Sequence, residues 1–248
     1  MGEDRVLDDL DAPLLELDDV ARSHQGGPYL PPLLDGARLR IAAGDFVAVW
    51  GSPRSGKTTL LRIASGIEPP DRGTVRVSGI DLATLSPSKR GAVRLETVGL
   101  ADAGGADVRD LKLVDYLALP VARRLSRRQA VIRARETLSI VGIEHTAELR
   151  WSMLDDGQRA RAGLAHALVR GPRLLLVDDV TRNMGAVEEA EIVGLLTRLV
   201  RDSGLAVLLT SSTLSAAVGA HETYILRGGT LDPVDDSSLR VARMTTRA

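Results

Sequence analysis

The segment from residue 39 to residue 66 constrains the fold most, because it predicts a strand, a glycine-rich turn and a helix in direct succession. Residues 39–51 read LRIAAGDFVAVWG and predict a strand that runs straight into the turn. Residues 51–58, GSPRSGKT, match the pattern G-x-x-x-x-G-K-[ST], and an amphipathic helix follows. A loop in this position curls its backbone amides around phosphate groups. The segment therefore predicts a site for the phosphates of a nucleotide.

The residues of this loop have separate expected roles. Lys57 reaches the β and γ phosphates, and the hydroxyl of Thr58 ligates Mg²⁺. The chain has few lysines, so a lysine in a glycine-rich turn is poorly explained by composition alone. A chance glycine-lysine turn is the alternative, and the flanking strand and helix argue against it. The predicted cofactor-binding residues of the loop are Gly51, Ser52, Pro53, Arg54, Ser55, Gly56, Lys57, Thr58 and Thr59.

A second apolar stretch ends in two carboxylates. Residues 173–179, RLLLVDD, predict a buried strand with Asp178 and Asp179 at its end. An isolated pair of this kind often only caps a helix. Beside a phosphate-binding loop, Asp178 is expected to hold Mg²⁺ through water. The expected cofactors are therefore ATP and Mg²⁺, and GTP is disfavoured because the chain has no Asn-Lys-x-Asp segment.

The remaining pattern predicts an α/β fold. Strands are expected at residues 14–20, 75–82 and 205–212, with a closing strand pair at 222–232; helices are expected at 159–170 and 186–202. With the phosphate loop, this alternation predicts a P-loop protein with a mainly parallel sheet, antiparallel β elements and a helical insertion at about 108–141. The predicted domain covers residues 14–232, with tails at 1–13 and 233–248.

Composition excludes several classes of function. The chain has no cysteine, and its four histidines lack the spacing of metal ligands, so any metal is expected to be held by oxygen atoms. A net charge of −1, with arginines scattered among acids, predicts no nucleic-acid partner. No apolar run approaches the roughly 20 residues that span a bilayer, and the acidic start is unlike a signal peptide. A cytoplasmic location is expected.

The order of these segments resembles the nucleotide-binding subunit of ATP-binding cassette (ABC) transporters, over about residues 14–232. The branch that it looks most like serves lipoprotein release, macrolide and peptide export, and cell division. The resemblance lies in SGIEPPDRGTVRVSGIDLATLS, in LKLVDYLALP, and in LDDGQRARAGLAHALVRGPRLLLVDDVTRN. It implies that ATP lies between two subunits, each phosphate loop facing the other's signature segment, and that closure moves an integral membrane permease. It also implies a P-loop NTPase fold with a RecA-like core and an inserted α-helical subdomain at about 104–168, and a peripheral position on the inner face of the membrane.

The signature segment of the resemblance is altered here. Asp155 stands where the family has the serine that donates to the opposing γ-phosphate, and Asp156 replaces a glycine; Gly157 and Gln158 match. A carboxylate about 4 Å from a phosphate charge is repelled by roughly 4 kcal/mol at an effective dielectric constant near 20. We therefore expect a poor lid for the partner's ATP, and this charge argument favours a heteromeric over a homodimeric assembly.

The catalytic positions of the resemblance are altered as well. The catalytic glutamate corresponds to Asp179, one methylene shorter, and the switch histidine corresponds to Ser212. The adenine-stacking aromatic corresponds to His24, and the magnesium-sensing glutamine corresponds to Ala103. The resemblance also implies that the permease docks near residues 100–114, although an ordinary surface loop explains that stretch equally well.

Three functions follow as alternatives. The first is a degenerate subunit that binds Mg-ATP, hydrolyses it weakly or not at all, and regulates a permease through ATP-dependent dimerisation. The second is an active homodimeric transport ATPase with Asp179 as its base. The third is an interaction protein outside transport that uses the fold as an ATP-gated or nucleotide-independent scaffold.

Overall fold

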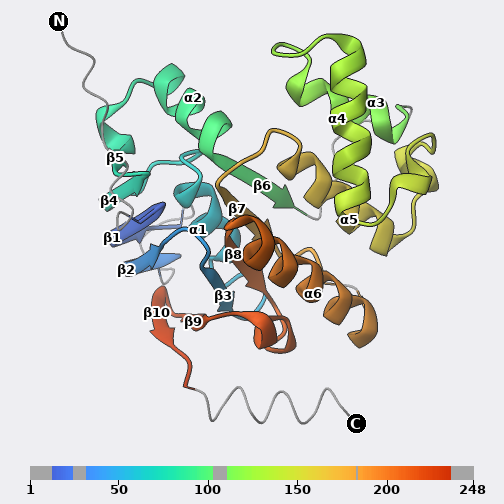
Figure 1. Cartoon of the computed structure of the whole chain (residues 1–248). Helices are drawn as coiled ribbons and strands as arrows, with labels where there is room; N and C mark the ends of the chain where they lie inside the picture. The colour runs from blue at the N-terminus through green and yellow to red at the C-terminus, as the bar shows by residue number, and fades with distance from the viewer. Residues whose placement is uncertain (1–12, 25–31, 103–110, 183, 236–248) are drawn as a thin grey trace, which may run out of the picture.

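The computed structural model describes residues 13–24, 32–102, 111–182 and 184–235. Two sheets and a group of helices are visible in it (Figure 1). The tails predicted at 1–13 and 233–248 lie almost wholly outside the described residues, so the domain boundaries stay a prediction.

The central sheet has six strands in the order β10-β9-β3-β8-β7-β6, and all its pairings are parallel except β9 with β10. Its middle strands β7 and β8 are apolar and buried along nearly their whole length, as expected when helices or a second sheet cover both faces. The strands are β3 (Phe46–Trp50), β6 (Val98–Asp102), β7 (Leu174–Asp178), β8 (Ala206–Ser211), β9 (Glu222–Arg227) and β10 (Thr230–Pro233).

Two hydrophobic cores flank this sheet. Leu175 and Val177 of β7 face one core, which also contains side chains of α5 and α6, whereas Leu174 and Leu176 face the other, against α1 and the second sheet. This alternation is the period of two that a strand imposes on its side chains. The helices of the described residues are α1 (Lys57–Ala64), α2 (Pro87–Thr97), α3 (Leu113–Ala118), α4 (Arg127–Ile140), α5 (Asp156–Leu168) and α6 (Ala186–Ser203).

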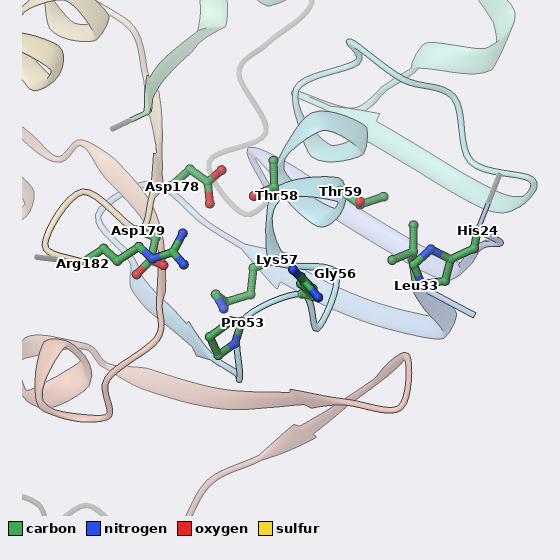
Figure 2. Close-up of a pocket in the computed structure, with 11 residues that line it drawn as sticks. His24, Leu33, Pro53, Gly56, Lys57, Thr58, Thr59, Asp178, Asp179 and Arg182 are labelled. Carbon is green, nitrogen blue, oxygen red and sulfur yellow. The ribbon is translucent and has the colours of Figure 1, made fainter. Parts of the chain in front are cut away.

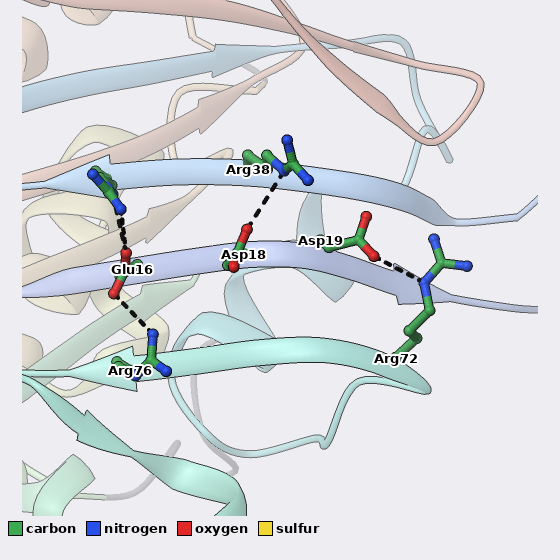
Figure 3. A network of polar contacts seen from close by, with 7 residues as sticks. Glu16, Asp18, Asp19, Arg38, Arg72 and Arg76 are labelled. Carbon is green, nitrogen blue, oxygen red and sulfur yellow. Dashed lines mark hydrogen bonds and ion pairs between the residues drawn. The ribbon is translucent and has the colours of Figure 1, made fainter.

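The second sheet is antiparallel, in the order β2-β1-β4-β5. Ion pairs connect its strands: Glu16 of β1 accepts from Arg40 of β2 and from Arg76 of β4, and these two contacts lower the pKa of the Glu16 carboxyl (Figure 3). Exposed pairs of this kind each contribute at most about 1 kcal/mol, so they mainly favour the observed register. The strands are β1 (Leu15–Arg22), β2 (Leu34–Ile41), β4 (Arg72–Val77) and β5 (Ile80–Asp81).

The predicted fold class is confirmed, and two local predictions were wrong. Residues 39–51 do not form one strand: a turn around Gly44, whose φ is +78°, separates β2 from β3, and the two strands join different sheets. The strand expected at 75–82 is likewise divided into β4 and β5. Helix α2 and strand β6 were not predicted. No residue of α2 is fully buried, and its Val93 packs only partly against the core.

Helices α3, α4 and α5 form the expected helical region between β6 and β7 and lie to one side of the central sheet (Figure 1). Side chains of all three helices belong to the same core as β7 and β8, so this region is packed on the sheet. Short 3₁₀ helices connect the elements at Leu82–Thr84, Leu119–Val121, Glu144–Thr146, Trp151–Met153 and Ser215–Gly219. No helix within the described ranges is long and apolar enough to cross a membrane.

The contact between β6 and α5 yields a stability prediction. A Cβ atom on Gly99 of β6 would lie 2.5 Å from the carbonyl oxygen of Ala167, so Gly99→Ala forces strand and helix apart. We expect it to lower the free energy of unfolding by about 1–3 kcal/mol in urea titrations. Gly91→Ala is the control, because that Cβ meets open space within α2, and it should be neutral or slightly stabilising. Equal effects of the two variants would contradict the tight packing.

Candidate functional site

The phosphate loop connects β3 to α1, and one glycine in it is sterically required. Gly56 precedes α1 with φ at +106°, and a Cβ atom there would lie 2.4 Å from the carbonyl oxygen of Leu33. Only glycine fits both constraints. Directly after Gly56 the first-turn amides of α1 have no acceptor within the helix, so they remain available to an anion.

Lys57 lies on the inner side of this loop. Its side chain is buried, with the residue only 6% exposed, and its ammonium donates to the carbonyl oxygens of Gly51 at 2.7 Å and Ser52 at 3.0 Å. Burial lowers the pKa of Lys57, while the nearby Asp179 and Asp178 carboxylates act in the opposite direction. An ammonium has three donors, so one remains for a phosphate oxygen.

Two residues of the loop lack the small size usual in such turns. Arg54 adopts φ +67°, a left-handed conformation that costs a non-glycine residue roughly 1–2 kcal/mol. Pro53 has no N–H group to offer a phosphate. Both side chains line the cavity described below.

The end of β7 places Asp178 opposite the phosphate loop. Asp178 pairs with Thr210 of β8, and the Thr210 hydroxyl donates to Asp178 Oδ1 at 2.9 Å. This leaves Oδ2 available, and Figure 2 shows the Asp178 carboxylate facing the hydroxyl of Thr58. Two hard oxygen donors with room for water and phosphate oxygens suit Mg²⁺, which seldom has an all-protein cage. The described residues contain no cluster of three or more His, Cys, Asp or Glu side chains placed for a metal.

Asp179 is held in an unusual position by Ser212. Its φ is +48°, and its two carboxylate oxygens accept from the backbone N–H of Ser212 at 2.9 Å and from the Ser212 hydroxyl at 2.6 Å. The indole N–H of Trp50 donates to the Ser212 carbonyl at 3.3 Å and helps to fix that residue. The two positions predicted as catalytic are therefore in direct contact with each other.

Most of the predicted site residues surround one cavity of about 660 Å³, a volume typical of ligand sites (Figure 2). Its lining residues are His24, Leu33, Pro53, Arg54, Gly56, Lys57, Thr58, Thr59, Asp178, Asp179 and Arg182. His24 lies at the end of this cavity far from Asp179. Gly51, Ser52 and Ser55 shape the loop without lining the cavity, and Ser212 contributes through Asp179.

Sequence reasoning missed Arg182 and Leu33 as lining residues. The available signal for Arg182 was its place in VDDVTRN, four residues beyond the predicted magnesium ligand. Ala103 and most of the stretch 100–114 lie outside the described residues, so the expectations about the missing glutamine and the permease contact stay predictions.

The signature segment lies apart from this cavity. Asp155, Gly157 and Gln158 line a separate cavity of about 180 Å³. Asp155 is the N-cap of α5: its Oδ1 accepts from the Gln158 N–H at 2.7 Å, and the Gln158 side chain accepts from the Asp155 N–H at 3.1 Å. Asp156 pairs with Arg159 at 3.0 Å. Each of the two carboxylates thus has a partner inside the chain, which reduces the repulsion expected from their charges alone.

A glycine-rich loop opening a helix, beside an acidic strand end of a parallel sheet, defines a phosphate-loop nucleotide-binding protein. The sequence profile of the ABC transporter family matches residues 34–182, more than half of the chain. The chain therefore belongs to the ABC transporter family and is an ATP-binding domain of that family. The predicted family is confirmed.

Curated relatives indicate which branch of the ABC transporter family this chain is similar to. The lipoprotein-releasing system ATP-binding protein LolD of Chromohalobacter salexigens is 32% identical over 215 residues, which cover 86% of this chain and 90% of that protein. The macrolide export ATP-binding/permease protein MacB of Shigella flexneri is 33% identical over 218 residues, 88% of this chain but only 34% of that longer protein. The chain is thus similar to the branch predicted from its sequence.

Solved structures agree on the fold. The dimeric ATP-binding cassette MJ0796 in a post-hydrolysis state, bound to ADP and Pi, is 23% identical and superposes with a TM-score of 0.78 over 88% of this chain and 96% of that one. At this identity the likeness supports the fold alone.

The capping role of Asp155 yields a second prediction. Asp155→Ala removes the acceptor for the Gln158 N–H and should lower the free energy of unfolding by about 1 kcal/mol. Asp155→Ser keeps an N-cap acceptor and should remain within about 0.5 kcal/mol of the parent. Urea titrations of the two variants check this, and equal stability of Asp155→Ala and the parent would contradict the cap.

Proposed function

We propose that this protein is a nucleotide-holding ABC subunit that binds Mg-ATP and hydrolyses it slowly or not at all. The observation that carries this proposal is the contact of Ser212 with both oxygens of Asp179. A general base needs an oxygen within hydrogen-bond reach of the attacking water. Here each oxygen already accepts a hydrogen bond from Ser212, which leaves fewer lone pairs for the attacking water and holds the carboxylate toward Ser212.

Side-chain length supports the same conclusion. The resemblance gives a glutamate at the position of Asp179, and the shorter aspartate withdraws its carboxylate by more than about 1 Å, a misplacement that lowers rates roughly a hundredfold. Ser212, at the position of the switch histidine, carries no charge and donates to Asp179 instead. Together these features favour retention of the nucleotide over its turnover.

The binding half of the site supports ATP holding. In our proposal Lys57 and the amides at the start of α1 hold the phosphates, and His24 contacts the base. Thr58 and Asp178 hold Mg²⁺, which when bound neutralises phosphate charge. Their arrangement around one cavity is consistent with these roles, and none of the contacts described above blocks Asp178 Oδ2 or the third Lys57 donor.

We propose a second ATP-binding subunit and an integral membrane permease as partners, which would hold the chain at the cytoplasmic face of the membrane. The functions of these relatives, lipoprotein release and macrolide export, favour an export or cell-envelope system. Asp155 and Asp156 favour a heteromeric assembly, because a homodimer would bring these acids to both sites. The capping and pairing of the two acids weaken that preference without reversing it.

A second candidate is an active homodimeric transport ATPase. The specific observation in its favour is that Asp179 lines the same cavity as Lys57 and Asp178. The two candidates differ in the rate of phosphate release, which a direct assay separates. Co-purification of an integral membrane protein separates both from a scaffold outside transport.

The decisive assay is a single turnover with excess protein and trace labelled Mg-ATP. We expect the parent chain to retain ATP and release little phosphate, both alone and with its membrane complex. Lys57→Ala should lose retention, because it removes the ammonium beside the phosphates. Prompt phosphate release by the parent that disappears in Asp179→Ala would instead establish the active enzyme.

A gain-of-function variant tests the cause of slow hydrolysis. Asp179→Glu combined with Ser212→His removes the short acid and the hydroxyl that donates to it, and it should raise single-turnover phosphate release by about a hundredfold or more in the assembled complex. Ser212→Ala alone is the matched control, because it frees one oxygen of Asp179 without restoring length or the histidine. If the double variant stays as slow as the parent while retaining ATP, the cause lies elsewhere than in these two residues.

A further inference from the structure

We propose that Arg182 is a phosphate-binding residue that holds the terminal phosphate of ATP from within the same chain. The inference rests on the proposed ATP-holding function and deepens it by naming the residue that distinguishes ATP from ADP. Arg182 belongs to none of the segments predicted to bind phosphate, yet its side chain lines the cavity beside Asp179 (Figure 2).

The backbone at Arg182 is fixed by a turn after β7. Its N–H donates to the carbonyl oxygen of Asp179 at 3.1 Å, and the intervening Val180 and Thr181 are 4% and 3% exposed. These two buried residues anchor the turn in the protein interior. The exposed Arg182 side chain therefore extends into the cavity from a backbone whose position is fixed by the turn.

The guanidinium is available for a ligand. Among the described residues it has no ion-pair partner within 4.0 Å, and both oxygens of the neighbouring Asp179 accept from Ser212. It is close enough to Lys57 that its charge contributes to lowering the pKa of that ammonium. Lys57 and Arg182 both face the cavity and favour a bound oxyanion, with Mg²⁺ offsetting the charges of Asp178 and Asp179. The planar fork of arginine matches phosphate oxygens in a bidentate manner.

The position within the cavity selects the terminal phosphate. Arg182 lies at the end that holds Asp178 and Asp179, opposite His24. Lys57 lies between these ends, at the start of α1, where it is expected to reach the β and γ phosphates. A group beyond Lys57 on the side of the acids contacts the last phosphate of ATP, and ADP lacks that phosphate.

This arrangement supplies from one chain a contact that a partner's signature segment would otherwise make. In a homodimer the partner could not make that contact, because Asp155 offers no hydroxyl donor and its carboxylate accepts from the first turn of α5. Arg182 adds five N–H donors and a permanent positive charge from the chain that also carries the phosphate loop. A subunit built in this way can retain ATP before it meets a partner.

Equilibrium dialysis with two probes tests the inference in the full-length chain with Mg²⁺: the non-hydrolysable ATP analogue AMP-PNP, and ADP. We expect Arg182→Gln to weaken AMP-PNP binding about 10–100-fold and ADP binding less than about 3-fold. Arg182→Lys should lie between the parent and Arg182→Gln, because it keeps the charge and loses the fork. Arg128→Gln is the matched control, since it makes the same change on the exposed face of α4, away from the cavity.

The outcomes separate this inference from the proposed function. Equal weakening of AMP-PNP and ADP by Arg182→Gln, or no weakening, overturns the role in terminal-phosphate binding, and a thermal melt that matches the parent excludes misfolding as the cause. Selective loss of AMP-PNP binding supports that role even if the single-turnover assay shows fast hydrolysis, in which case only the proposed function fails. A parent chain that binds neither probe overturns both.

Discussion

The parallel hydrogen-bonded register of β3, β8 and β7 is the constraint on which the site depends. Trp50 pairs with Ser211, and Thr210 pairs with Asp178, so three chain segments leave the sheet at one edge. Backbone bonds continue the alignment beyond the strands: the N–H of Gly51 donates to the Ser211 carbonyl, and the N–H of Asp179 donates to the Thr210 carbonyl. A slip of one residue would turn every side chain to the opposite face and separate the loop from the acids.

The sequence was sufficient where signals were local. A glycine pattern between strand and helix identified the loop, and an apolar run ending in acids placed Asp178, because parallel strands deliver their ends to a common edge. Local signals failed where an element had no buried face, as in α2, or where a short turn divided an apolar stretch, as at Gly44. The family and the fold were therefore predictable, whereas several element boundaries were not.

The fine geometry of the site could not be read from the sequence, because it depends on contacts between distant residues. Asp179 and Ser212 are 33 positions apart, and their double hydrogen bond exists only after β7 and β8 have paired. The acids of the signature segment were predicted from charge alone to repel a phosphate, but each has a partner within the chain. Arg182 followed the expected acids in the sequence, and only the turn at residues 179–182 directs it into the cavity.

The N-cap at Asp155 has a consequence for which residues this position can accept during evolution. Serine and aspartate are nearly equivalent as N-caps, since both accept from the same backbone amides at the start of a helix. Exchange of one for the other at the start of α5 therefore leaves the free energy of folding almost unchanged. Either residue can replace the other at this position without an unstable intermediate. Selection for a folded protein therefore does not conserve the serine that the family has at the position of Asp155. Only selection acting on the bound nucleotide can do so.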